Sequence, residues 1–95
     1  MAIDDGTTAA IRQARDYAQT AETSNELEEI QEFGGRARTT LESVNRSGLD
    51  EAIRDAIQQA IRHGTNAQNA LSPEAGQFEA RQFRELMNDI LGDQG

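Results

Sequence analysis

The sequence has no cysteine, lysine or tryptophan and only one proline among its 95 residues. The absence of cysteine excludes disulfides, zinc sites built from thiolates and catalysis by a cysteine nucleophile. No apolar run approaches the roughly 18 residues of a membrane-spanning helix, and the first residues lack the basic and apolar segments of a secretion signal. We therefore expect one soluble domain covering residues 1–95.

Bulky apolar residues are also scarce. Leu, Ile, Val and Phe occupy 17 of the 95 positions. This share of the chain is below the roughly 20% at which disorder becomes a serious possibility. Alanine, with 14 positions, supplies much of the remaining apolar content. The spacing of these residues therefore has to decide whether the chain folds.

Charge is strongly unbalanced, with 17 acidic residues against nine arginines and a net charge of -8. Together with the missing lysine, this resembles the composition of proteins from salt-in halophiles such as haloarchaea and their viruses. At about 1 M salt the Debye length falls to about 3 Å, so surplus carboxylates stop repelling one another while still holding water. The resemblance implies adaptation to high salt, and the alternative is an acidic protein from a GC-rich mesophile.

Apolar residues recur at helical spacing in four segments, at about residues 7–21, 23–45, 49–63 and 73–91, and none shows the alternation of a strand. Pairs of residues typical of capping mark where each helix begins. The predicted caps are Asp4 or Asp5, Thr23 with Ser24 as the alternative, Ser47 with Asp50, and Ser72 before Pro73. We expect an all-α fold, a small four-helix arrangement with short connections.

Glycines are expected to mark helix ends, with Gly64 capping the third helix and Gly92 stopping the fourth. The pair Gly34-Gly35 is different, because the heptad spacing that begins at Leu27 passes through Gly34 unchanged. Each internal glycine costs about 1 kcal/mol relative to alanine. We predict a continuous but kinkable helix to about Asn45, and we expect Leu71 to staple onto the start of the last helix.

No set of residues indicates catalysis. His63 is the only histidine, and its position near a helix end gives it a structural role. The acidic cluster from Glu22 to Glu32 lacks the Glu-x-x-His pairs of carboxylate metal cages and predicts a solvated face. We therefore expect no enzyme activity, no cofactor and no metal site.

The middle of the chain is less acidic than its ends, which leaves one alternative function open. Residues 36–71 hold five arginines against four acids, and the helix at 49–63 follows a Ser-Gly turn, as a recognition helix does. A small DNA-binding regulator using helix 49–63 is therefore the alternative. Its arginines are already spaced to pair with acids along the helices, which is typical of a solvated face.

The remaining prediction is a non-enzymatic subunit that binds protein, either further copies of itself or other subunits. We do not expect nucleic acid or a membrane as its partner. A component of a virion or other multi-subunit particle, in the cytoplasm or the virion, suits a short acidic helical chain. The second and fourth helices carry most of the bulky apolar residues. The interface candidates are Leu27, Ile30, Phe33, Gly34, Leu41, Phe78, Phe83 and Met87.

Overall fold

Four α-helices make up most of the computed structural model, which describes residues 4–94. They are α1 (Asp5–Thr23), α2 (Leu27–Glu42), α3 (Glu51–Gln68) and α4 (Pro73–Gln94). No strand occurs within residues 4–94. The all-α four-helix prediction is confirmed.

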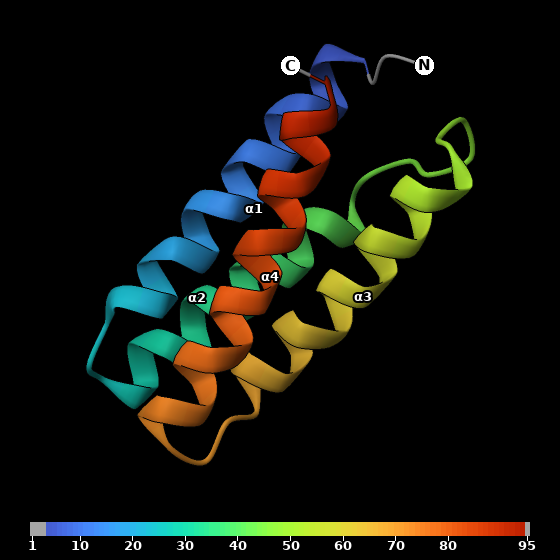
Figure 1. Cartoon of the computed structure of the whole chain (residues 1–95). Helices are drawn as coiled ribbons and strands as arrows, with labels where there is room; N and C mark the ends of the chain where they lie inside the picture. Colours follow the sequence, from blue (N-terminus) through green and yellow to red (C-terminus); the bar gives the residue numbers. More distant parts are fainter. Residues whose placement is uncertain (1–3, 95) are drawn as a thin grey trace.

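The helices run alternately in opposite directions (Figure 1). α1 packs against α2 and α4, and α3 packs against the same two helices, so the four form a closed bundle. Its principal extents are 39 × 20 × 17 Å. The connections at 24–26 and 69–72 lie at one end of the bundle, and the connection at 43–50 lies at the other (Figure 1). Such short links favour antiparallel neighbours.

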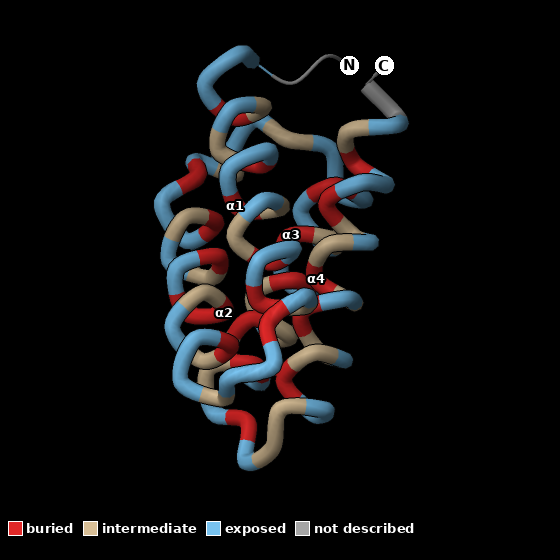
Figure 2. Tube along the Cα trace, turned by 90° about the vertical axis from the view of Figure 1, so that its left-hand side faces the viewer, coloured by how far each residue is buried: buried red, intermediate tan, exposed pale blue. Residues whose placement is uncertain are grey.

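Each helix turns one stripe of its surface inward, and the buried positions recur every three or four residues (Figure 2). The largest fully buried side chains are Phe83, Ile11, Ile30, Leu41, Ile57 and Met87. A smaller apolar cluster of Ala21, Ile30 and Ala80, with Phe33 packed against it, lies nearer the 24–26 connection. Alanine fills many of the remaining inward positions, so the helices approach closely and the core stays thin.

Two of the four predicted helix starts are confirmed by their hydrogen bonds. Asp4 is the N-cap of α1, and its Oδ1 accepts from the backbone N–H of Thr7 at 2.7 Å. The hydroxyl of Ser72 accepts from the backbone N–H of Ala75 at 3.2 Å, directly before Pro73 opens α4. Both side chains satisfy amide groups that have no partner inside the helix.

The predicted Thr23 cap is wrong, because Thr23 is the last residue of α1 and its hydroxyl donates to the carbonyl of Gln19. Ser24 is the C-cap of α1, and its hydroxyl accepts from the backbone N–H of Glu26. Glu26 holds the N-cap position of α2 without a side-chain hydrogen bond. Ser24 therefore ends the first helix through its backbone and forms a turn to Glu26, the residue at which the second helix begins.

The predicted start of the third helix is shifted. Ser47 bonds to the side chain of Asn45 within the connection, and Asp50 occupies the N-cap position of α3. Leu49, expected at the beginning of the helical stripe, lies before the helix and packs half-buried against the main core.

The predicted ends at Gly64 and Gly92 are wrong, because α3 continues to Gln68 and α4 to Gln94. No glycine within residues 4–94 has a positive φ. A side chain at Gly64 would place its Cβ 2.9 Å from the Cβ of Arg38 and 3.3 Å from the ring of Phe83. Gly64 is therefore present for its small size between helices, not for the left-handed conformation of a helix cap.

The prediction that the second helix continues through Gly34-Gly35 is confirmed, although α2 ends at Glu42 rather than near Asn45. Gly34 is buried against α3, where an added Cβ would lie 2.7 Å from the Cβ of Ala67. The close approach of α2 and α3 thus requires glycine at this position.

Candidate functional site

The interface candidates on α2 and α4 occupy two different environments. Five of them are buried inside the bundle of a single chain: Ile30, Gly34, Leu41, Phe83 and Met87. Leu27 and Phe33 are half-buried, and Phe78 is exposed. Of the candidates, only these last three reach the surface in this fold.

Phe33 already has neighbours within the chain. Its ring lies 5.9 Å from the ring of Tyr17 on α1, measured between centroids. The guanidinium of Arg36 lies 5.0 Å from the centre of the Phe33 ring, within the range of a cation–π contact. Phe33 therefore packs between α1 and α2 at the side of this helix pair.

The exposed large hydrophobic residues of the described chain are Leu71, at 94% exposure, and Phe78, at 53%. The predicted staple is wrong, because Leu71 projects from the 69–72 connection instead of packing onto α4. Ala75, also exposed, lies three residues before Phe78 on α4, and Leu71 precedes the helix in the 69–72 connection. We call these three residues the Leu71–Phe78 surface.

Charged residues border this surface on the outer side of α4. Glu74 lies four residues before Phe78 and Arg81 three residues after it, and both are exposed. Further along the same side, Glu85 and Asp89 are exposed and acidic. The apolar part of the outer α4 side is thus confined to the end near the 69–72 connection.

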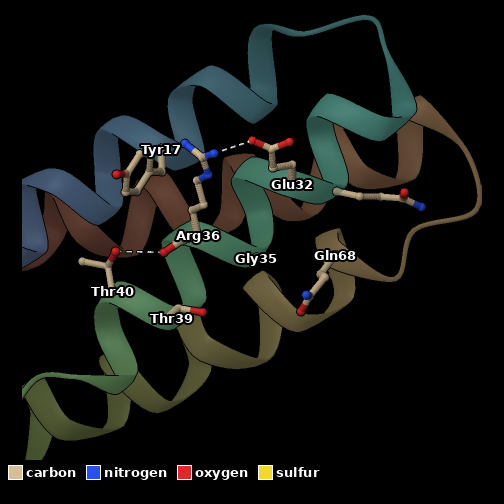
Figure 3. Close-up of a pocket in the computed structure, with 8 residues that line it drawn as sticks. Tyr17, Glu32, Gly35, Arg36, Thr39, Thr40 and Gln68 are labelled. Atoms are coloured by element: carbon tan, nitrogen blue, oxygen red, sulfur yellow. Dashed lines mark hydrogen bonds and ion pairs between the residues drawn. The ribbon is translucent and has the colours of Figure 1, made fainter.

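A shallow hollow of about 540 Å³ lies along α2 between α1 and α3 (Figure 3). Tyr17 enters it from α1 and Gln68 from α3, and the rest of the lining comes from α2. The lining residues are Tyr17, Gln31, Glu32, Gly35, Arg36, Thr39, Thr40 and Gln68.

Several polar groups around this hollow are already paired within the chain. Arg36 and Glu32 form an ion pair at 2.7 Å, as their spacing predicts. Gln31 donates to the carbonyl of Ala70 at 2.8 Å, and the hydroxyl of Thr40 donates to the carbonyl of Arg36. The lining of the hollow is thus largely polar and offers hydrogen-bonding groups.

Glu22 is the centre of a charge cluster between α1 and α4. Its carboxylate accepts from Arg84 at 2.5 Å and from Arg81 at 3.4 Å. The hydrogen bond from Arg84 lowers the pKa of Glu22, against the opposing effect of burial. The same bond raises the pKa of Arg84. This cluster ties the first helix to the last.

A second polar cluster joins α3 to α4. The Nδ1 of His63 lies 2.8 Å from the Oε1 of Glu79, which also accepts from the side-chain amide of Asn66 at 3.0 Å. Within residues 4–94, no group of three or more His, Cys, Asp or Glu side chains is placed to hold a metal ion. His63 thus has a partner 16 residues along the chain, which helical spacing within α3 had no means of revealing.

The solvent side of α3 bears on the DNA-binding alternative. Arg54 and Arg62 are exposed there, and so are Glu51 and Asp55. Because acids alternate with the arginines, this side presents no basic stripe to a phosphate backbone.

No family model matches the chain, and comparisons with curated proteins and with solved structures find no similar protein. No helix in the described part of the chain combines the length and the apolar character needed to cross a bilayer.

Proposed function

We propose that this protein is a non-enzymatic, acidic helical subunit that binds another protein chain through the Leu71–Phe78 surface. The observation that carries the proposal is the exposure of Leu71 and Phe78, since the other large apolar side chains within residues 4–94 are at least partly covered. Aromatic side chains such as Phe78 contribute large contact areas at protein interfaces.

The remainder of the molecule supports a role in contact rather than catalysis. The hollow along α2 and the clusters around Glu22 and Glu79 use their polar groups to join helices of the same chain. A small elongated bundle with two exposed apolar side chains near one end suits repeated assembly in a virion or another multi-subunit particle. Its acidic surface suits a solvent of high salt, where excess carboxylates keep molecules apart without strong repulsion.

Site-directed photo-crosslinking in cells that make the protein tests this function. A benzophenone side chain at position 71 or 78 is expected to form adducts with protein. The same group at the exposed position of Gln58, on α3, serves as the matched control and is expected to form none. Excess unlabelled wild type should suppress the adducts and Phe78→Ser should not. Equal crosslinking at all three positions contradicts the proposal.

A further inference from the structure

The charges beside the Leu71–Phe78 surface are arranged in a way that points to its occupant. Glu74 and Arg81 lie seven residues, or two helical turns, apart, so they fall on the same flank of the outer α4 side. Phe78 lies between them, one turn from each. An acid, an aromatic ring and a base therefore follow one another along a single exposed helix side.

We propose that the Leu71–Phe78 surface binds a second copy of this chain, with the two α4 helices antiparallel and a two-fold axis passing beside Phe78. This inference rests on the proposed function, because it uses the same surface and names the partner. In an interface with two-fold symmetry, a contact from residue i to residue j is repeated from j to i. The axis beside Phe78 places Glu74 of each copy opposite Arg81 of the other, and the two phenylalanine rings meet at the centre.

The same register separates the remaining acids. Antiparallel helices centred near residue 78 set Glu85 opposite Leu71 in the 69–72 connection of the other copy and carry Asp89 beyond it, so neither acid faces an acid of the other copy's α4, which begins at Pro73. In a parallel pair in register, each charged residue would instead face the same residue of the other copy. Like charges would then oppose each other at Glu74, Arg81, Glu85 and Asp89. Like charges placed opposite each other oppose association, so the charge pattern favours the antiparallel pair over the parallel one.

Arg81 can turn toward a second copy by giving up its long hydrogen bond to Glu22, which keeps its bond to Arg84. It is half exposed, and its hydrogen bond to Glu22 is longer than the one that Arg84 makes through its Nε. Arg84 holds Glu22 at 2.5 Å independently of Arg81. Glu74→Arg leaves the Glu22 cluster untouched, whereas Arg81→Glu brings a second carboxylate near Glu22, so circular dichroism and thermal melting check that each variant is folded before its association is compared.

Sedimentation equilibrium in about 0.15 M KCl tests the register with two opposite charge reversals, at a salt where charges still act over about 8 Å. Wild type is expected to form a concentration-dependent dimer. Glu74→Arg alone and Arg81→Glu alone should each weaken dimerisation by about tenfold or more, because each places like charges opposite each other. An equimolar mixture of the two variants forms a heterodimer in which one contact again pairs Glu74 with Arg81 and the other pairs the same charges reversed. The mixture should therefore lose the like-charge repulsion and associate more strongly than either variant alone.

Net charge alone predicts a different result, which makes the experiment decisive. Glu74→Arg lowers the acidity of the chain, so simple repulsion between acidic chains would make this variant associate more strongly than wild type. Stronger association of Glu74→Arg, or no recovery in the mixture, overturns the antiparallel pair.

Phe78→Ser should abolish dimerisation while Gln58→Ser leaves it intact, and a dimer that survives Phe78→Ser also overturns the proposal. A folded wild-type chain that stays monomeric in both about 0.15 M and about 2 M KCl rules out the second copy, whereas the proposed function fails if positions 71 and 78 form no more crosslinks to protein than the Gln58 control.

Discussion

At the scale of single residues, the buried glycines mark the positions where neighbouring helices pack too closely to accept a side chain. A Cβ added at Gly64 would meet the Cβ of Arg38 and the ring of Phe83, whereas one added at Gly92, also inside a helix, would meet no neighbouring atom within 4 Å. The same substitution at these two sites therefore separates helix propensity from packing.

Gly64→Ala is expected to lower the free energy of unfolding by up to about 2 kcal/mol. Alanine favours the helix by about 1 kcal/mol, but overpacking against a well-filled core costs about 1–3 kcal/mol. Gly92→Ala is the control and should be neutral or stabilise by up to about 1 kcal/mol. Urea denaturation of both variants measures the difference, and a stabilising Gly64→Ala would contradict the close packing of α3 against α2 and α4.

Glu22 provides the prediction for pH. Its folded-state pKa is lowered by the hydrogen bond from Arg84. Stability from this carboxylate is therefore fully present above its unfolded pKa, near 4.5, and is lost as the pH falls through the lower folded pKa. At neutral pH, Glu22→Gln should cost about 1.5–3 kcal/mol, the range for a hydrogen bond to a charged group.

The cost of Glu22→Gln is expected to shrink as the pH is lowered below about 4.5. Urea denaturation at a series of pH values between neutral and about 3 measures this dependence. Glu28→Gln removes one negative charge from an exposed position of α2 and is the matched control. A cost of Glu22→Gln that stays constant through the acid range would show that the ion pair adds nothing to stability.

At the scale of the helices, the four N-termini differ in how well they are capped. Asp4 and Ser72 cap α1 and α4 with side-chain hydrogen bonds, whereas Glu26 gives α2 no such bond although its backbone is extended, as at an N-cap. The long glutamate side chain reaches past the first amide groups of the helix, to which a shorter carboxylate bonds well.

Glu26→Asp is expected to stabilise the protein by about 0.5–1 kcal/mol without changing its net charge. Ser72→Ala, which removes an existing cap, should cost about 1 kcal/mol. Thermal melting followed by circular dichroism measures both, and the two shifts should have opposite signs. A destabilising Glu26→Asp would indicate that the Ser24 turn, not the cap, determines how α2 begins.

At the scale of the whole molecule, the thin core gives the folded state little stabilisation, and the net charge of -8 lowers its stability further. The alanines bring the helices close but bury little area, and repulsion among surface carboxylates in dilute buffer opposes the compact state. Raising KCl from about 0.1 to 2 M should therefore increase both the helical signal and the melting temperature. A double variant with glutamine at Glu28 and Glu29, both exposed on α2, should melt with a smaller salt response. A melt independent of salt would remove the argument for adaptation to high salt.

The sequence alone determined the number of helices, their approximate extents and the inward stripes, because helical periodicity is a local property of the chain. It also located the cap at Ser72 and narrowed the first cap to Asp4 or Asp5, because a capping side chain bonds to an amide only three residues away. The continuity of α2 through Gly34 followed from the unbroken spacing of apolar residues on both sides.

Only the tertiary structure decided which glycines are spacers, which partner His63 takes and which large apolar residues remain exposed. Gly64 has the sequence position of a helix cap, but its role depends on Arg38 and Phe83, which come from other helices. Leu71 has the position of a staple, and whether it packs depends on the path of the 69–72 connection between α3 and α4. These properties depend on residues distant in the chain, which periodicity within one helix does not encode.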